Sequence, residues 1–297
     1  MAKLLGDRMD GPARLRELLA GDRPIVAPGA YDALSARLIE EAGFAVVYMT
    51  GFGTTASLIG RPDVGLLTMT EMVGNARRIA AAVELPVIAD ADTGYGNALN
   101  VIRTVREYEA AGVAGIHIED QVSPKRCGHM EGKQVVPAAT MVDKVRAAVE
   151  ARHNPDFVLI ARTDARAVEG LDAAIDRARR YLDAGADVLF VEAMRSDAEI
   201  ERVAAEFRGV PLVFNWAEGG KTPPQDFERL RALGFRLVLC PLSALLAATG
   251  AIREVLARIE RDGTPVEAVH GLPGFGEFTD FIGLPEVTDI GERFGRG

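Results

Sequence analysis

Short apolar runs alternate with amphipathic stretches along most of the chain. Each run holds about four to six residues of Val, Ile, Leu and Phe, which is typical of a parallel strand buried on both faces. The stretches between the runs have helical length and carry their apolar residues on one face. The predicted strands lie at residues 24–29, 45–51, 86–92, 115–120, 157–164, 188–193, 211–216 and 236–242.

Glycines mark the ends of several predicted helices. Gly43, Gly112, Gly185 and Gly234 occupy positions where a left-handed cap is expected. Alternating strands and helices imply right-handed crossovers and a parallel sheet. Eight such units favour a closed barrel, and no Gly-rich dinucleotide fingerprint follows the first strand. We therefore predict an α/β fold, a (β/α)8 TIM barrel forming a single domain over residues 1–297.

The chain continues past the eighth predicted strand for longer than one barrel helix requires. Residues 243–263 have the pattern of a long helix, and a loop and a short helix follow. We predict that residues 243–297 form a C-terminal helical extension of the barrel domain. One use for such an extension is packing on another subunit of a homo-oligomer.

Composition and charge exclude several classes of protein. The chain is 48% hydrophobic and 26% charged, as expected for a soluble globular protein. A net charge of −9 without a basic run disfavours nucleic-acid binding. We find neither a signal peptide nor the roughly 20 apolar residues of a membrane span. The cysteines, Cys127 and Cys240, cannot form a disulfide framework. These features predict a cytoplasmic protein with no membrane partner.

Polar residues follow the predicted strands at the end where barrel enzymes carry their chemistry. Each one alone has a structural explanation, such as a helix cap or an ion pair. Six consecutive strands that end this way predict one functional rim. The residues are Tyr48, Thr50, Asp90, Asp92, Glu119, Asp120, Arg162, Asp164, Glu192 and Asn215.

Three carboxylates on neighbouring strands suggest a metal site. Asp90 and Asp92 are two residues apart, so both face the same side of the third strand, and Glu119 ends the fourth. Without a His or Cys partner, this oxygen-rich set suits Mg²⁺ or Mn²⁺ and not zinc. The structural alternative is that Asp92 caps the turn that follows it and Glu119 pairs with an arginine. We predict a Mg²⁺ site here.

The segment of residues 121–137 is the longest irregular stretch within the strand–helix series. Loops of this length inside a compact domain are usually functional, often as lids. Cys127 lies here beside Lys125, Arg126 and His129. Positive neighbours favour the thiolate, so we expect a lowered pKa for Cys127. The thiol is therefore a candidate acid–base group or nucleophile.

Several segments together resemble a known superfamily. The lid sequence PKRCGH follows IEDQ and precedes GK, and PGAYDALSARL, DADTGYGN, ARTDA, VEA and NWAEGGKTP occur in the matching order. They cover about residues 27–242 and resemble the isocitrate lyase and phosphoenolpyruvate mutase superfamily. The short chain is similar to its methylisocitrate lyase and 2,3-dimethylmalate lyase branch.

This resemblance implies roles for individual residues. Asp90 would bind Mg²⁺ or Mn²⁺, and Asp92 would act through water. Cys127 would be the acid–base residue, Tyr48 would assist deprotonation, and Arg162 would clamp a substrate carboxylate. Two further residues, Glu119 and Asp63, would complete the metal site. The implied substrate-binding residues are Thr50, Gly51, Phe52, Lys125, Gly128, His129, Arg162, Glu192 and Asn215. The resemblance also implies a homotetramer.

The implied activity is cleavage of a 2-hydroxy di- or tricarboxylate, a 2-alkylmalate or 2-methylisocitrate, between C2 and C3. The products would be a 2-oxo acid such as pyruvate and a second carboxylic acid. The segment AEGGKTP, where methylisocitrate lyases usually have TEFGKTP, is closer to dimethylmalate lyases and petal-death-type proteins. Cys127 argues against the mutase and phosphonopyruvate hydrolase branches, although residues 281–294 resemble the tails of mutase relatives. Alternatives are an oxaloacetate hydrolase or decarboxylase, phosphoenolpyruvate mutase-type P–C chemistry, and a barrel that binds without catalysis.

Overall fold

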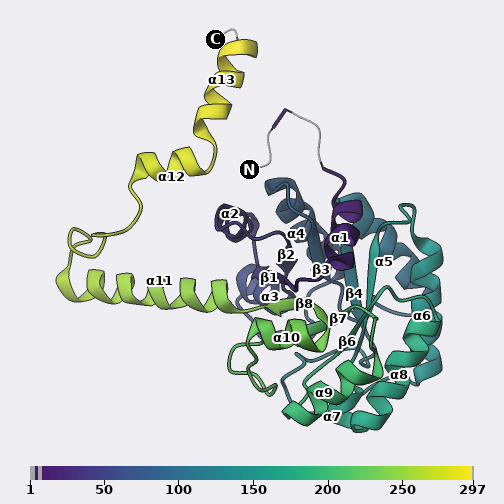
Figure 1. The fold of residues 1–297 in the computed structure, drawn as a ribbon. Coiled ribbons are helices and arrows are strands. Elements are labelled where there is room, and N and C mark those ends of the chain that lie inside the picture. The colour runs from purple at the N-terminus through teal and green to yellow at the C-terminus, as the bar shows by residue number, and fades with distance from the viewer. Residues whose placement is uncertain (1–3, 6–8, 296–297) are drawn as a thin grey trace. The chain divides into compact units, whose positions relative to one another are not determined.

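Eight parallel strands form a closed barrel in which each strand pairs with the next and β8 pairs with β1 (Figure 1). The computed structural model describes residues 4–5 and 9–295. Every predicted apolar run overlaps one strand, which confirms the (β/α)8 barrel. The strands are β1 (Ile25–Ala30), β2 (Val47–Met49), β3 (Val87–Asp90), β4 (Gly115–Glu119), β5 (Val158–Thr163), β6 (Val188–Val191), β7 (Leu212–Asn215) and β8 (Phe235–Cys240).

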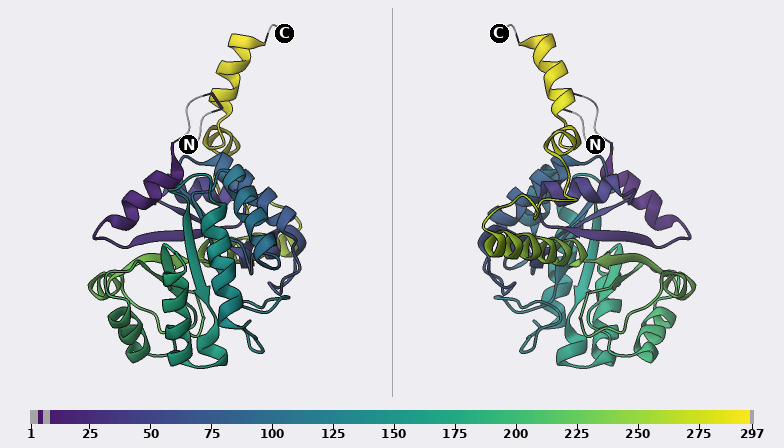
Figure 2. Two further views of the ribbon diagram at one scale, coloured as in Figure 1. Left: turned by 90° about the vertical axis from the view of Figure 1, so that its right-hand side faces the viewer. Right: turned by 90° about the vertical axis from the view of Figure 1, so that its left-hand side faces the viewer.

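Helices run outside the strands of the barrel, as both views of Figure 2 show. The four expected glycine caps all have positive φ, between 84° and 104°. The helices of the barrel are α1 (Gly11–Ala20), α2 (Ala33–Glu41), α3 (Gly51–Ile59), α4 (Met69–Ala82), α5 (Ala98–Ala111), α6 (Ala138–Ala151), α7 (Ala165–Val168), α8 (Leu171–Asp183), α9 (Asp197–Glu206) and α10 (Phe227–Leu233).

Two apolar cores hold the barrel together. The larger lies between the strands and the surrounding helices, and the smaller fills the barrel interior. Leu15 and Leu19 of α1 belong to the interior core together with inward-facing residues such as Ile25, Val158 and Leu237. The first helix therefore closes the N-terminal end of the barrel. Polar chemistry is left to the opposite end, where the strands finish.

Residues 9–245 form one compact unit, and the chain after Leu245 belongs to a second. The second unit contains most of α11 (Ser243–Asp262), then α12 (Phe275–Phe281) and α13 (Leu284–Phe294), none of which has a buried residue. The helical extension begins where the sequence predicts it. A single domain over residues 1–297 stays a prediction, and its residues 1–3, 6–8 and 296–297 lie outside the described part. Among the helices of the described residues, none combines the length and apolar character needed to cross a membrane.

Candidate active site

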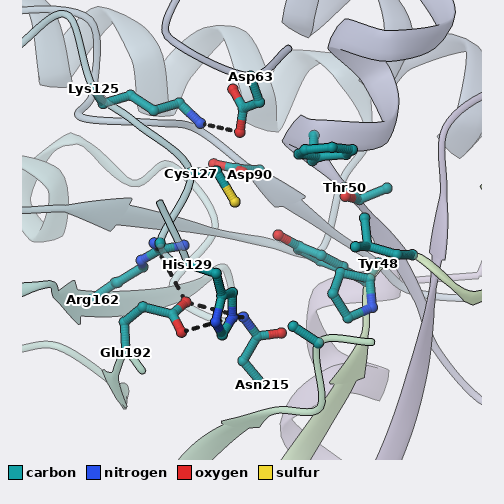
Figure 3. Close-up of a pocket in the computed structure, with 15 residues that line it drawn as sticks. Tyr48, Thr50, Asp63, Asp90, Lys125, Cys127, His129, Arg162, Glu192 and Asn215 are labelled. Carbon is teal, nitrogen blue, oxygen red and sulfur yellow. Dashed lines mark hydrogen bonds and ion pairs between the residues drawn. The ribbon is translucent and has the colours of Figure 1, made fainter. Parts of the chain in front are cut away.

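A pocket lies at the C-terminal ends of the strands, within the barrel unit (Figure 3). Predicted residues from seven strand ends and loops meet there, with the sulfur of Cys127 pointing into it. Gly51, Asp92 and Glu119 do not line it but contact Asp90 or Arg162, which do. The lining consists of Tyr48, Thr50, Phe52, Asp63, Asp90, Lys125, Cys127, Gly128, His129, Arg162, Glu192 and Asn215, together with Ala217, Pro241 and Leu242.

The last three lining residues escaped the sequence analysis. They are apolar and follow β7 and β8, so no polar signal marks them. Their position directly after a strand could have identified them, because every strand end of a barrel faces the same rim. Together with Phe52 they give the pocket an apolar portion.

Asp90 ends β3 and is approached closely by the start of α3, which follows β2. Gly51 begins α3 against this carboxylate, and a Cβ there would overlap Asp90 Oδ2. Glycine is therefore required by space at position 51. The amide of Asp92 donates to Asp90 Oδ1 at 2.9 Å, and Asp92 has a positive φ of 48°. These contacts fix both carboxylates at the edge of the pocket.

Lys125 of the lid lies between two of the predicted metal-binding carboxylates. Its Nζ is 2.7 Å from Asp63 Oδ2 and 2.7 Å from Asp92 Oδ1, and the residue is only 4% exposed. The sequence analysis assigned Lys125 to the substrate alone. In the structure this lysine also offsets part of the negative charge of the acidic cluster.

The cluster nevertheless lacks positive charge. Burial raises the pKa of Asp92 to about 6, even though Lys125 opposes the shift. Burial also raises the pKa of Glu119 well above its usual value, and Glu119 Oε1 has no hydrogen-bond partner among the described residues. Burial alone would raise the pKa of Asp90 as well, but His117, Lys125 and Arg162 together hold it below its usual value.

These observations fit a divalent cation that is bound largely through water. Within the described part of the chain, no three His, Cys, Asp or Glu side chains converge closely enough to hold a metal ion by themselves. A Mg²⁺ ion commonly keeps several waters and takes one or two carboxylates, so a tight protein cage is not required. A buried, unpartnered oxygen on Glu119 and an excess of carboxylates supply what such an ion needs.

Arg162 on β5 has carboxylates on three sides. Its Nε is 2.9 Å from Asp164 Oδ2 and 3.2 Å from Glu119 Oε2, and its NH2 is 3.4 Å from Glu192 Oε2. The pair predicted as a structural alternative for Glu119 is therefore present. Asp164 holds the guanidinium in a fixed orientation toward the pocket.

The thiol of Cys127 differs from the sequence expectation. Burial raises the pKa of Cys127, although the amide of His129 donates a hydrogen bond to its sulfur. The expected lowering by positive neighbours is wrong, because Lys125 is already paired with carboxylates and Arg126 is exposed. The backbone amide of Cys127 donates to Asp63 O at 3.1 Å, which keeps the side chain at the pocket. Cys127 is therefore a neutral thiol near pH 7.

A second loop, residues 216–226, meets the lid at His129. The amide of Lys221 donates to His129 Nδ1 at 3.0 Å, and His129 Nε2 lies 3.4 Å from Glu192 Oε1. Gly220 packs on the same ring, and a Cβ there would lie 2.8 Å from two of its atoms. Asn215 Nδ2 donates to Glu192 Oε2 at 3.0 Å.

Tyr48 has a partner inside the barrel. Its hydroxyl lies 2.9 Å from Nε2 of His117, which is 3.7 Å from Asp90 Oδ1. Burial raises the pKa of Tyr48 well above 10 and lowers the pKa of His117 to about 4. Near neutral pH the pair is therefore a phenol beside a neutral imidazole.

Asp120 was expected at the same rim and lies elsewhere. Its Oδ2 accepts hydrogen bonds from Thr163 Oγ1 and Tyr181 OH, each at 2.7 Å, and Arg177 is 3.3 Å away. Tyr181 and Arg177 belong to α8, so the side chain points to the outer layer. The reason is the alternation of a strand: when Glu119 faces the barrel, Asp120 faces the helices.

Comparison with known proteins identifies the family. Residues 15–260 match the phosphoenolpyruvate phosphomutase family. The chain is 46% identical to 2,3-dimethylmalate lyase of Eubacterium barkeri over 289 residues, covering 97% of this chain and 100% of that protein. It is 48% identical to a probable 2-methylisocitrate lyase of Corynebacterium glutamicum over 237 residues, covering 80% and 77%.

Solved structures agree. A crystal structure of 2,3-dimethylmalate lyase has a TM-score of 0.91 at 41% identity, covering 98% of this chain and 97% of that one. An oxaloacetate acetylhydrolase bound to 3,3-difluorooxalacetate has a TM-score of 0.91 at 40% identity, with 98% and 99% covered. A phosphonopyruvate hydrolase complex with oxalate and Mg²⁺ has a TM-score of 0.88 at 35% identity, with 96% and 99% covered. The chain therefore belongs to the phosphoenolpyruvate mutase and isocitrate lyase superfamily.

Proposed function

We propose that this protein is a Mg²⁺-dependent carbon–carbon lyase that cleaves a 2-alkylmalate to a 2-oxo acid, such as pyruvate, and a second carboxylic acid. The observation that carries the proposal is the neutral thiol of Cys127 in a pocket that also holds Arg162 and the acidic cluster. A lyase of this type needs a proton donor, a carboxylate clamp and a cation site together. The lyase names of the similar sequences support the same reaction class.

Asp90, Asp92, Glu119 and Asp63 would hold the cation, with water completing its coordination. When bound, Mg²⁺ supplies positive charge at the oxygen and carboxylate of C2, where negative charge develops as the 2-oxo acid forms. A solved complex of phosphonopyruvate hydrolase with oxalate and Mg²⁺ supports the use of Mg²⁺ by a similar protein of this fold. Mn²⁺ would bind the same oxygen ligands.

The protein residues then divide the reaction between them. Arg162 binds the carboxylate on C2 with its planar fork, held in place by Asp164. Tyr48 would accept the proton of the C2 hydroxyl while passing its own proton to His117, because the buried phenol does not ionise by itself. Burial keeps the resting imidazole neutral, and the Asp90 carboxylate, 3.7 Å away, would offset the positive charge that the ring gains in this step.

An electron pair of the C2 oxygen forms the C2=O bond of the 2-oxo acid as the C2–C3 bond breaks. The pair of the broken bond moves to C3, and Cys127 would transfer its thiol proton to that carbon, which leaves a thiolate.

Closure of the pocket protects this step. A carbanion next to a carboxylate would be protonated by bulk water, so the site must exclude solvent before the bond breaks. The lid and the loop of residues 216–226 meet at His129 over the pocket. This contact supports a closed arrangement in which Cys127 is the proton donor at hand.

The apolar portion of the pocket favours alkyl-substituted substrates. Phe52, Ala217, Pro241 and Leu242 offer no hydrogen-bonding side chain, which suits a methyl group and not another carboxylate. This favours 2,3-dimethylmalate, which would yield pyruvate and propionate, over the tricarboxylate 2-methylisocitrate. A second candidate is oxaloacetate cleavage, which the close structural likeness to oxaloacetate acetylhydrolase favours.

Pyruvate release, with Mg²⁺ or with chelator, is the test. The panel consists of 2,3-dimethylmalate, 2-methylisocitrate, oxaloacetate and phosphonopyruvate, with oxalate also measured for oxaloacetate. We expect chelator-sensitive pyruvate from an alkylmalate. Oxalate from oxaloacetate alone would establish the second candidate instead, and turnover of phosphonopyruvate alone would indicate P–C chemistry and remove the proposed role of Cys127.

We also propose a cytoplasmic homo-oligomer, a tetramer by its resemblance to the family. The second unit supports this, because its helices bury no residue within the chain and expose large apolar side chains. Sedimentation velocity of the full chain and of a chain ending at residue 262 would show whether the last two helices are needed for assembly. The exposed apolar residues are Leu246, Ile252, Leu256, Val266, Val269, Leu272, Phe275, Phe278, Ile282, Leu284, Val287 and Phe294.

A further inference from the structure

We propose that Lys133 and Asp164 are positioning residues that fasten the lid segment of residues 127–129 to the base of the substrate clamp. The inference rests on the proposed function, because it explains how Cys127 is kept where its proton is needed. Neither residue lines the pocket, so both act through other groups. We call their ion pair the latch.

The latch is a buried contact between a lid residue and a strand end. Lys133 Nζ is 2.8 Å from Asp164 Oδ1 and also donates to the backbone oxygen of Gly128. Lys133 is 8% exposed and Asp164 is fully buried. One ammonium group thus joins the lid backbone, one residue after Cys127, to β5.

Gly128 shows how tightly the lid is seated. A Cβ at this position would lie 2.5 Å from Arg162 NH2 and 2.7 Å from Glu192 Cγ. The lid backbone therefore rests directly on the side chains of the clamp. Lys133 holds the same residue from its carbonyl side, so Gly128 is contacted by the clamp on one side and by the latch on the other.

Asp164 connects this contact to the clamp itself. Its Oδ2 accepts a hydrogen bond from Arg162 Nε at 2.9 Å, and its Oδ1 accepts one from Lys133 Nζ at 2.8 Å. Its amide donates to Asp120 Oδ1 at 2.9 Å, and Asp120 is bound by Thr163 and Tyr181 of the barrel wall. The same carboxylate therefore orients the substrate arginine and holds the lid, which places the proton donor and the clamp in one fixed geometry.

A second lid ion pair provides a matched control. Lys221 Nζ pairs with Glu131, whose side chain is 84% exposed. Exposed pairs contribute little, whereas removal of one partner of a buried pair is costly. If the latch positions the lid, losing Lys133 must matter far more than losing Lys221.

The test is the rate of Cys127 alkylation by iodoacetamide in Lys133→Met and Lys221→Met, followed by mass spectrometry without substrate. Cys240, on β8 outside the lid, serves as the internal reference. We expect Cys127 to react about tenfold faster or more in Lys133→Met, because local opening exposes the thiol. The rate in Lys221→Met should stay within about twofold of the original.

Two outcomes would overturn the latch. Equal Cys127 rates in the two variants would mean that Lys133 does not hold the lid. The second is an alkylation rate that rises equally at Cys127 and Cys240 in Lys133→Met, which would mean that the whole barrel loosens. Lys133→Gln keeps an N–H for Gly128 O, and an equal rise at both cysteines in this variant as well would overturn the latch. Because no substrate is present, this result stands or falls separately from the lyase proposal.

A kinetic comparison adds a readout specific to positioning. Once a substrate is found, Lys133→Met should lower kcat by about 100-fold while pyruvate binding changes little, because Arg162 keeps Asp164 as its partner. A change in KM alone would contradict the proposed placement of Cys127.

Discussion

On the β3–β4 side of the pocket burial outweighs the cationic partners of Asp92 and Glu119, whereas on the β5 side Asp164 is paired with both Arg162 and Lys133. Burial raises the pKa values of Asp92, to about 6, and of Glu119. On the other side Arg162 and Lys133 overcome burial and hold the pKa of Asp164 well below its usual value. One barrel rim thus carries an unbalanced and a balanced group of charges next to each other.

The contrast separates two tasks. The balanced side is already arranged to receive a carboxylate, because Arg162 is held by Asp164 before any ligand arrives. The unbalanced side would gain stability from an added cation. Metal dependence and substrate orientation should therefore be separable by mutation.

The largest effect should come from Asp90→Ala, which weakens the unbalanced side at the edge of the pocket. We expect metal affinity to collapse and turnover to fall by about a thousand-fold or more. Titration calorimetry with Mg²⁺ and initial rates measure the two effects. Asp176→Ala removes a carboxylate of an exposed pair on α8 and should change neither. Normal Mg²⁺ affinity in Asp90→Ala would refute the metal assignment.

Cys127→Ser should have the second-largest effect on turnover, because it removes the proposed proton donor. We expect turnover to fall by about 10²–10⁴-fold, while Mg²⁺ and pyruvate still bind. Cys240→Ser is the control, since Cys240 is absent from the pocket lining. Full activity of Cys127→Ser would exclude the thiol as the acid.

Arg162→Lys tests the balanced side and should have a smaller effect. A lysine keeps the charge and loses the planar fork, so we expect kcat/KM to fall by about 10–100-fold with Mg²⁺ affinity nearly unchanged. Arg166→Lys is matched, because Arg166 also pairs through two nitrogens, with Glu199, and is absent from the pocket lining. A loss of Mg²⁺ affinity in Arg162→Lys would show that the two sides are not independent.

The smallest effect concerns stability and pH. A carboxyl group whose pKa is raised on folding contributes stability at low pH and loses it as pH rises through about 6. Without divalent metal, Asp92→Asn should therefore melt a few degrees above the original chain at pH 7.5, and the difference should shrink by pH 5.

Because the prediction compares Asp92→Asn with the original chain, the pH dependence of the titratable groups that both chains share cancels. Among these is His117, whose pKa of about 4 acts in the opposite direction because its buried ring must stay neutral. Saturating Mg²⁺ should reverse the order of melting at pH 7.5. A melting difference that is the same at both pH values would contradict the charge imbalance.

The sequence predicts the barrel well because its signals are local and repeated. An apolar run such as residues 157–164 and a glycine such as Gly112 at a helix end each report one element, and eight repeats fix the topology. The rim residues also follow from this pattern, since strand ends share one face. The family resemblance is confirmed by the similar sequences.

Other features depend on contacts between distant segments. The pKa of Cys127 was predicted in the wrong direction because the sequence shows charged neighbours but not that Asp63 and Asp92 engage Lys125. Asp120 was placed at the rim because a polar residue after a strand does not reveal which face it takes. The role of Lys133 depends on Asp164, 31 residues away.

The contact of Gly220 with His129 limits how the enzyme can be redesigned or can drift in evolution. Any side chain at 220 would press on the imidazole that links the two loops, so this position offers no freedom to alter the substrate. Ala217 lines the pocket and contributes only a methyl group to it. A library that varies Ala217 and leaves Gly220 unchanged is therefore the economical way to search for new substrate side groups.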